Sequence, residues 1–413
     1  MSYGRMAGGM ANDRYEGINM DRMRKYRLQR TRETMAAHGV GTLITWDPYA
    51  IRYITGGYVT IPNRYNGRQS VIIPRNGDPI CMFMSSFSMA ALNEEMPWLN
   101  GKIMENLGPA RDASMSDVET VAKFIMKVLA EHGLTNEPVA LDGCMRESMM
   151  IESLKKMGVK DFADGVMVCF EARSIKSQDE IACLRLAVSA ADAAFEDIRQ
   201  AIRPGVRECD LMGIGIKRLY EMGCDETQEF VVASGPRTNP LHIDFTDRVI
   251  SPGDPVIVDI NGASYMGYKS CYYRAFLCGR ATQEQKDVYE DARRLMYNGM
   301  SAIKDGACVN DVRAKWPDSP KYWGYNSWPD VRGYALGHGL GISLHEAPIM
   351  FFAGLGLGPN TTFKEGMVLA VETWSGKKGG DFGIRLEEDI LVTKDGYELL
   401  TKWPVNEITE CWI

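Results

Sequence analysis

The sequence predicts a two-domain α+β protein, in which a smaller α/β domain over residues 1–172 precedes a larger domain over residues 173–413. Length is the first observation, because 413 residues exceed what one typical core accommodates and suit two domains. The second is an alternation of short β-rich runs with helical patterns through the first half of the chain. The third is a change of character between residues 170 and 176, after which a long amphipathic pattern begins.

Strands, a hairpin and a helix are expected in the first half. Two apolar runs within residues 70–84 flank Asn76-Gly77, the dipeptide that best fits a tight hairpin turn. Ser116 followed by Glu119 predicts a capping box at the start of a helix. Two further strands are expected at residues 41–46 and 138–143.

The second half is expected to open with a long helix. Ser177 is a suitable N-cap, Asp179 and Glu180 favour a first helical turn, and Pro204-Gly205 would end the helix. We therefore place the domain boundary just before this helix. The patterns that follow predict helices at 209–222 and 283–304 and strands at 229–234, 255–261 and 265–278.

Composition narrows the class of protein. The hydrophobic fraction is 45% and the charged fraction 24%, which are typical of globular domains. The net charge is −7 with acids and bases interleaved, so nucleic acid is not an expected partner. Without an apolar signal segment or membrane span, and with ten cysteines outside CxxC pairs, we expect a cytoplasmic protein with free buried thiols.

Three carboxylates stand out because they lie in or at the ends of apolar strand patterns. Asp259 ends VIVD, Glu372 ends VLAVE, and Glu387 lies within GIRLEEDILV. A carboxylate buried among aliphatic residues needs a charged partner, and a metal ion is one such partner. Pairing with Arg274 and Arg385 is an equally good explanation of the pattern alone.

Histidines add weight to the metal interpretation. The chain has five, and His242, His338 and His345 lie in the same half as the three carboxylates. A single histidine is more often structural than catalytic, so none of them is decisive alone. Imidazole and hard oxygen ligands converging from several strands are nevertheless typical of hydrolytic Zn, Mn or Fe sites.

Five motifs in order resemble the pita-bread superfamily of aminopeptidase P, prolidase, methionine aminopeptidase and creatinase. They are SGPRTNPLHIDF (234–245), IVDINGASYMGYKSCYYRAF (257–276), GHGLGISLHEAP (337–348), VLAVETW (368–374) and GIRLEEDILVT (383–393). The RSIKSQDEI junction and the first half look like the prolidase and creatinase branch. The resemblance implies a C-terminal pita-bread catalytic domain preceded by a smaller creatinase-type N-terminal domain.

The resemblance also implies roles for individual residues. Members of the superfamily bind two metal ions through two aspartates, one histidine and two glutamates, and two more histidines assist. Residue by residue, the metal ligands match Asp259, His338, Glu372 and Glu387. The assisting histidines match His242 and His345, which would hold the carbonyl oxygen and carry protons to the leaving group.

The second aspartate of the pattern is missing. Cys271 stands where it is expected, and the spacing from Asp259 is one residue longer than in the peptidases. A thiolate ligand would favour Zn or Fe over Mn, whereas a neutral buried thiol would leave a one-metal or metal-free site. The expected cofactor is therefore a divalent metal (Zn, Fe or Mn), present as one ion or none.

Within the superfamily the nearest likeness is to the dimethylsulfoniopropionate lyase branch. SGPRTNP, WDPYAIRYITG (46–56) and the longer spacing after Asp259 all look like that enzyme. Its three aspartates match Asp259, Asn261 and Cys271, so two of three are changed. Unlike the lyase pattern, the chain keeps His242 and His345.

Three functions follow as hypotheses. The first is hydrolysis of a C–N bond in a small amide, dipeptide or amino-acid derivative, with His242 and His345 as proton carriers. The resemblance to creatinase implies that such hydrolysis can proceed without metal. The second is a lyase, in which aromatic residues near Asp259 cradle a cationic group. The third is a non-catalytic binding protein on a decayed peptidase fold. The aromatic residues of the lyase hypothesis are Tyr265, Tyr268, Tyr272 and Tyr273.

The resemblance also implies a homodimer.

Overall fold

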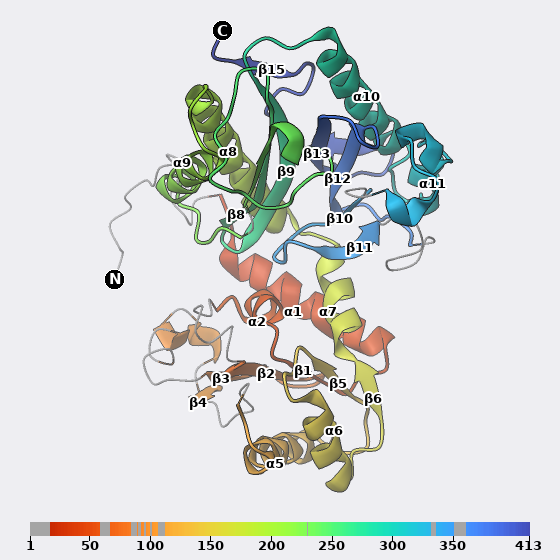
Figure 1. Ribbon diagram of the computed structural model, residues 1–413. Coiled ribbons are helices and arrows are strands. Elements are labelled where there is room, and N and C mark those ends of the chain that lie inside the picture. Colours follow the sequence, from red (N-terminus) through yellow and green to blue (C-terminus); the bar gives the residue numbers. More distant parts are fainter. Residues whose placement is uncertain are drawn as a thin grey trace. The chain divides into compact units, whose positions relative to one another are not determined.

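The computed structural model divides into two compact units, which are described separately (Figure 1). One unit comprises residues 20–173, and the other comprises residues 1–19 and 174–413. The predicted domain bounds, 1–172 and 173–413, stay a prediction about independently folding units. The structure describes residues 17–57, 67–83, 89, 92–94, 96–99, 101–105, 112–228, 230–331, 336–350 and 361–413.

The smaller unit is built on a six-stranded mixed sheet of order β4-β3-β2-β1-β5-β6. The predicted hairpin is confirmed: β2 and β3 are antiparallel on either side of Asn76-Gly77. The strands are β1 Thr42–Thr45, β2 Gln69–Pro74, β3 Ile80–Phe83, β4 Ile103–Glu105, β5 Val139–Asp142 and β6 Phe162–Asp164. The helices are α1 Met20–Ala37, α2 Pro48–Thr55, η1 Pro97–Leu99, α5 Met115–Glu131, α6 Glu147–Lys156 and α7 Gly165–Ser174.

The capping box predicted for α5 lies two residues earlier than expected. Ser114, not Ser116, is the N-cap, and Asp117 completes the box. Asp is as able as Glu to return a hydrogen bond to the N-cap amide, so a Glu-based pattern misplaced the start. The apolar face of α5 is as predicted, because Val118, Val121 and Ile125 are buried.

The larger unit contains two sheets. The first has the order β15-β9-β8-β7 and the second the order β11-β10-β12-β13-β14. The strands are β7 Phe230–Ser234, β8 Pro255–Tyr265, β9 Tyr268–Cys278, β10 Gly337–Gly339, β11 Glu346–Met350, β12 Val368–Gly376, β13 Gly383–Val392, β14 Tyr397–Leu399 and β15 Thr409–Cys411. The helices are α8 Gln178–Ala201, α9 Glu208–Glu221, η2 Gly235–Arg237, α10 Gln283–Met300, α11 Val309–Arg313, η3 Pro320–Trp323 and η4 Trp328–Asp330.

Helices pack against both sheets of the larger unit and bury the strands that carry Asp259, Cys271 and Glu372. In Figure 1, α8 lies beside β8 and β9, and α10 lies beside β12 and β13, while α9 packs against α8 and β7. Helix α8 begins at Gln178 with Ser177 as its N-cap, as predicted, and Glu180 completes a capping box. All residues of β8, β9 and β12 are buried, which explains their nearly continuous apolar sequences. A charged residue on such a strand is therefore out of contact with solvent and needs a partner within the protein.

One boundary in this unit differs from expectation. The sequence predicts a strand ending at residue 261 and another starting at 265, whereas β8 continues to Tyr265 and the turn falls at Met266-Gly267. Both turn residues have positive φ, 53° and 89°. The strand therefore continues through Asn261-Gly262, where its pairing with β9 shifts by one residue.

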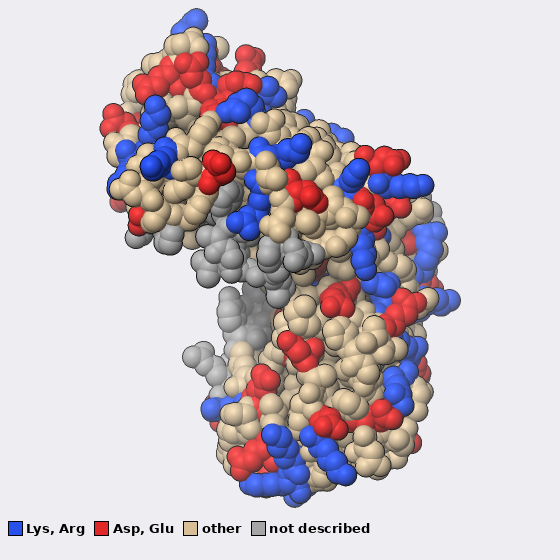
Figure 2. Space-filling view, turned by 90° about the vertical axis from the view of Figure 1, so that its right-hand side faces the viewer, with Lys and Arg blue, Asp and Glu red and all other residues tan. Residues whose placement is uncertain are grey.

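On the face shown in Figure 2, basic and acidic side chains alternate without gathering into a field of one sign. Among the described residues, no helix combines the length and the apolar character needed to cross a membrane. All ten cysteines are free thiols, eight of them buried.

Candidate metal centre

Two pairs of neighbouring strands bring the predicted acidic residues together. On β8 and β9, Asp259 lies opposite Tyr273 and Asn261 lies opposite Cys271. On β12 and β13, Glu372 lies directly opposite Glu387. The strands β9 and β13 pack against one another, so the two pairs face a common volume.

The extra residue between Asp259 and Cys271 forms a β-bulge. The register shifts between Asn261 and Ala263, so Asn261 still opposes Cys271 while Ala263 opposes Ser270. Gly262 carries the bulge with φ of 77°, and a Cβ there would lie 2.9 Å from the Cβ of Gln228. Only glycine tolerates both the conformation and the contact. The longer spacing read from the sequence is thus a local bulge inside one continuous strand.

Three potential ligands of different chemistry meet at one point. Among the described residues, Cys271, His338 and Glu387 place one ligand atom each within 4.8 Å of one another, and all three are buried. The Nδ1 of His338 donates to the carbonyl oxygen of Gly339 at 2.9 Å, so Nε2 is the nitrogen available to a ligand. This Nε2 lies 3.8 Å from an oxygen of Glu387. Burial lowers the pKa of His338 to about 4, which keeps the imidazole neutral and able to bind a metal.

Several carboxylate oxygens around this point lack hydrogen-bond donors. In the described part of the chain, nothing donates a hydrogen bond to either oxygen of Glu387 or to Oδ1 of Asp389, whereas Tyr273 and Asn261 lie close enough to Asp259 to oppose the rise of its pKa. Burial raises the pKa of Asp259 to about 8, and it raises the pKa of Glu387 and of Asp389 as well. Buried oxygens without donors are costly, and a cation among them removes the cost. The donor set therefore fits a divalent metal.

Arginines satisfy only part of the cluster. The guanidinium of Arg385 binds Glu372, as the pairing alternative predicts. Arg274, however, forms its ion pair with Glu388 at 2.7 Å and reaches only the backbone carbonyl oxygen of Glu387. Because Glu388 points to the opposite side of β13 from Glu387, the pairing alternative accounts for one of the two glutamates and leaves the other to a cation.

Cys271 interacts with two neighbours in the cluster. Its Sγ donates to Oδ1 of Asn261 at 2.7 Å, and its backbone N–H donates to Oδ2 of Asp389 at 3.2 Å. Burial raises the pKa of the Cys271 thiol, so the thiol is neutral unless a cation displaces its proton.

His345 and His338 are close neighbours. Their ring centroids are 4.2 Å apart with the planes inclined by 51°. His338 is buried and His345 is exposed, so His345 lies on the solvent side of the cluster. A solvent-accessible imidazole next to the potential metal ligands can exchange protons with a bound substrate.

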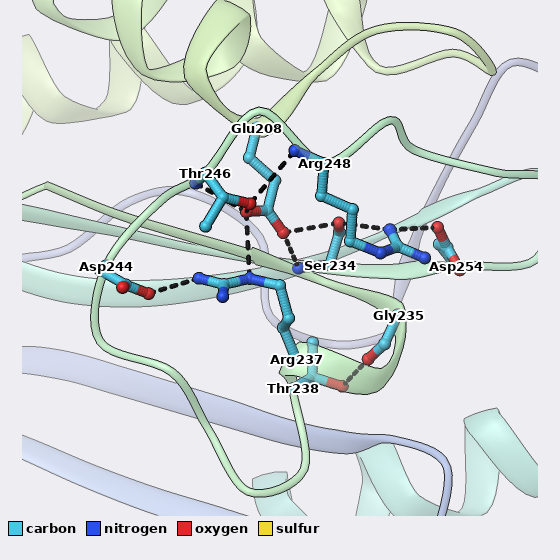
Figure 3. A network of polar contacts seen from close by, with 9 residues as sticks. All are labelled: Glu208, Ser234, Gly235, Arg237, Thr238, Asp244, Thr246, Arg248 and Asp254. Atoms are coloured by element: carbon cyan, nitrogen blue, oxygen red, sulfur yellow. Dashed lines mark hydrogen bonds and ion pairs between the residues drawn. The ribbon is translucent and has the colours of Figure 1, made fainter.

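His242 lies in the exposed loop between η2 and β8, and the base of this loop is tightly fastened (Figure 3). One oxygen of Glu208 accepts hydrogen bonds from the backbone N and Oγ of Ser234, before the loop. The other oxygen accepts from the backbone N and Oγ1 of Thr246, after it. Glu208 is fully buried and also forms an ion pair with Arg237 at 3.1 Å.

Further contacts fix the rest of the His242 loop. Arg237 binds Asp244 across it, and the backbone N–H of His242 donates to the carbonyl oxygen of Arg237 at 2.9 Å. Asn239 donates to the carbonyl oxygens of Lys377 and Gly380 in the turn after β12. The loop thus holds an exposed histidine on a rigid support, as Figure 3 shows for its base.

The matches with known proteins agree with this geometry. Residues 182–394 match the family described as metallopeptidase family M24, and residues 27–174 match the creatinase/prolidase N-terminal domain. The chain belongs to metallopeptidase family M24. It is therefore an enzyme of a hydrolase family with the predicted fold class, a C-terminal pita-bread domain preceded by a creatinase-type domain.

Relatives of this M24 chain include peptidases and a lyase. It is 30% identical over 270 residues to the Xaa-Pro dipeptidase of Pyrococcus furiosus, covering 64% of this chain and 74% of the relative. It is 25% identical to the dimethylsulfoniopropionate lyase of Roseovarius nubinhibens, covering 94% of this chain and 87% of the lyase. The structure of a Xaa-Pro dipeptidase from Bacillus anthracis has a TM-score of 0.74 at 24% identity, over 94% of this chain and 99% of that one, which shows the shared fold.

M24 metallopeptidases use divalent metal ions, and the cluster of this M24 chain includes a residue that sequence reasoning missed. Asp389 lies two residues after Glu387 on β13, so it faces the same side of the strand. Its position in the run Glu387-Glu388-Asp389 hid it, because three consecutive acids give no indication of which ones face inward. The strand alternation, applied from Glu387, would have found it.

Three of the four tyrosines of the lyase hypothesis have partners within this M24 chain. The hydroxyl of Tyr268 donates to Glu180 at 2.6 Å, and that of Tyr272 donates to Asp192. Tyr273 lies under the guanidinium of Arg385, 4.8 Å from ring centroid to carbon. All three are buried, so packing explains them better than a cradle for a cationic substrate.

Proposed function

We propose that this M24 enzyme hydrolyses a C–N bond in a small substrate: an amide, a dipeptide or an amino-acid derivative. The observation that carries the proposal is the position of the exposed His345 ring, 4.2 Å from the buried ring of His338, which belongs to the group of three potential metal ligands. This arrangement supports the roles of His345 as a proton carrier and of its neighbours as a cation site, the two groups that amide hydrolysis requires. The Xaa-Pro dipeptidase relative supports a peptide-like substrate.

The metal would be held by Cys271, His338 and Glu387, with Asp259 and Glu372 beside them as further ligands. A divalent ion bound there would polarise a carbonyl and lower the pKa of water. His345 would donate a proton to the leaving nitrogen, since it lies on the solvent side of His338. His242 would act as the second proton carrier, on the loop fastened by Glu208.

We infer that the site holds a single ion. Glu372 already binds the guanidinium of Arg385, and Cys271 supplies one sulfur where the family pattern has a bridging carboxylate. Two divalent ions a few ångströms apart repel strongly unless several carboxylates offset their charge. The thiolate favours Zn or Fe over Mn.

A cytoplasmic location and a homodimer complete the proposal. Ten free thiols are compatible with a reducing compartment. Sedimentation equilibrium would give the mass of the assembly, which we expect to be twice 46.1 kDa.

Elemental analysis of protein purified without added metal, combined with a substrate panel, tests the proposal. We expect at most one Zn or Fe per chain, lost in Cys271→Ser but kept in Cys278→Ser, which changes a buried thiol elsewhere on β9. We expect turnover of Xaa-Pro dipeptides or related amides. Two ions per chain, or an enzyme inactive on every amide tested, would contradict this function.

The lyase alternative is favoured by the bulge at Gly262. This bulge sets Asn261 opposite Cys271, at the positions that match the lyase aspartates. A lyase would remove a proton next to a carboxylate and expel a leaving group without consuming water. Following dimethylsulfoniopropionate by proton NMR decides between the two, because turnover of this compound with no amide hydrolysis would establish the lyase. Turnover of neither, with metal bound, would favour the non-catalytic binding protein.

A further inference from the structure

The segment between His338 and His345 depends on a buried lysine from a different strand. Lys269 lies on β9, two residues before Cys271, and its side chain is fully buried. A buried ammonium is costly unless each of its protons finds an acceptor. The acceptors of Lys269 therefore show what it is there to hold.

The ammonium donates hydrogen bonds to two carbonyl oxygens and forms an ion pair with a carboxylate. Nζ lies 2.8 Å from the carbonyl oxygen of Ile342, 3.1 Å from that of Gly267 and 3.1 Å from a carboxylate oxygen of Glu226. The backbone N–H of Lys269 also donates to the carbonyl oxygen of Gly341 at 2.9 Å. Both the main chain and the side chain of one residue thus bind the segment that joins the two histidines.

A second buried lysine holds the far end of the same segment. Lys176 forms an ion pair at 3.1 Å with Glu346, the residue next to His345, and both side chains are buried. Glu346 in turn accepts a hydrogen bond from the backbone N–H of Ser343. A Cβ at Gly341 would lie 2.5 Å from a carboxylate oxygen of Glu346, so the segment folds closely over this side chain.

We propose that Lys269 is a positioning residue that sets the place of His345 relative to the potential metal ligands. Lys176 fixes Glu346 and the backbone N–H of Lys269 fixes Gly341, so the ammonium adds the side-chain contact that holds Ile342 between them. Without the ammonium, the path from Ile342 to Leu344 loses this contact. A shift there moves His345, whose ring contacts His338, whereas Cys271, His338 and Glu387 are held by strand pairing. The functional consequence rests on the proposed role of His345 as a proton carrier.

The test uses Lys269→Met, which keeps the length of the side chain and removes the ammonium. We expect kcat to fall by about 10²-fold, the effect of misplacing a catalytic group by about 1 Å, while KM and bound metal stay within twofold of the unmodified enzyme. Lys286→Met is the matched control, because Lys286 is a half-exposed lysine that pairs with Glu410. It should leave all three quantities unchanged.

Histidine NMR separates this inference from the proposed function. With five histidines in the chain, each imidazole can be assigned, and Lys269→Met should move the His345 signals and leave those of His242 unchanged. Unmoved His345 signals, or loss of the metal together with activity, would overturn the positioning role. If the His345 signals move but kcat does not, positioning stands and the proposed proton-carrier role of His345 fails. Should Lys269→Met not fold, Glu226→Gln removes the charged acceptor alone and should give a smaller change of the same signals.

Discussion

Two buried glutamates in the larger unit have opposite surroundings. Glu208 and Glu387 are both 0% exposed. Four hydrogen bonds and one ion pair converge on Glu208, from residues at both ends of the His242 loop. Nothing in the described part of the chain donates a hydrogen bond to Glu387, whose nearest charged neighbours include other carboxylates.

The difference in hydrogen-bond partners indicates different roles for Glu208 and Glu387. A buried charge that the protein itself satisfies stabilises the fold, and Glu208 uses it to join the start of α9 to a loop. A buried charge left without donors weakens the fold unless something from outside binds it. Glu387 belongs to the second kind, so under the proposed function the protein gives up stability there in order to bind a cation.

The largest expected effect comes from removing the residue that the Glu208 network supports. His242→Ala should lower turnover by about 10³-fold, since general acid–base groups contribute about 10²–10⁴. Bound metal should stay unchanged, because the change lies outside the metal ligands. His132→Ala, in the smaller unit, is the control for losing an imidazole. An active His242→Ala enzyme would show that the network holds its loop for some other purpose.

Exchanging each glutamate for its amide tests the comparison directly. Glu387→Gln should abolish metal binding and leave the metal-free protein as stable as before or about 1–3 kcal/mol more stable. Glu208→Gln should keep the metal and destabilise the fold by about 1–3 kcal/mol, because donors are left facing an amide NH₂. Urea unfolding and elemental analysis of both variants give the signs. If both substitutions changed the free energy of unfolding in the same direction, the two glutamates would not differ in the way proposed.

Restoring a carboxylate at Cys271 should strengthen the cation site. Cys271→Asp should raise metal content, since it adds a hard ligand and an anion, without necessarily raising native activity. Asn261→Asp is a parallel variant at the residue opposite on β8. Metal analysis at equal added Zn or Mn gives the comparison. A full complement of two ions in the unmodified protein would show that the carboxylate was not needed.

The smallest expected effect is the change with pH in the stability of the metal-free protein. The folded pKa of Asp259, about 8, exceeds its unfolded value of about 3.9, so stability falls as pH rises between them. His338, with a folded pKa of about 4 and an unfolded value of about 6.5, acts in the opposite sense below pH 6.5. Between pH 6.5 and 8 the metal-free protein should therefore lose about 1–2 kcal/mol, and bound metal should suppress the loss. A flat stability profile of the metal-free protein over this range would count against a neutral Asp259.

The sequence could predict local features but not remote partners. Apolar flanks identified Asp259 and Glu387, because a charge within a buried strand is visible in the pattern itself. Glu208 escaped notice because its partners lie 26 and 38 residues away, beyond any periodicity. Likewise, the spacing showed that one residue was extra before Cys271, whereas only backbone geometry reveals that Gly262 absorbs it.

That bulge has a consequence for how such enzymes diversify. Inserting one codon between Asp259 and Cys271 shifts the strand register beyond Asn261, yet the pairs nearer the start of β8 stay aligned. Side chains alternate along a strand, so the inserted residue changes the pairing only of the residues after it, from Ala263 to Tyr265. A chain can thus gain or lose this residue in a single step while Asp259 and Asn261 keep their partners on β9.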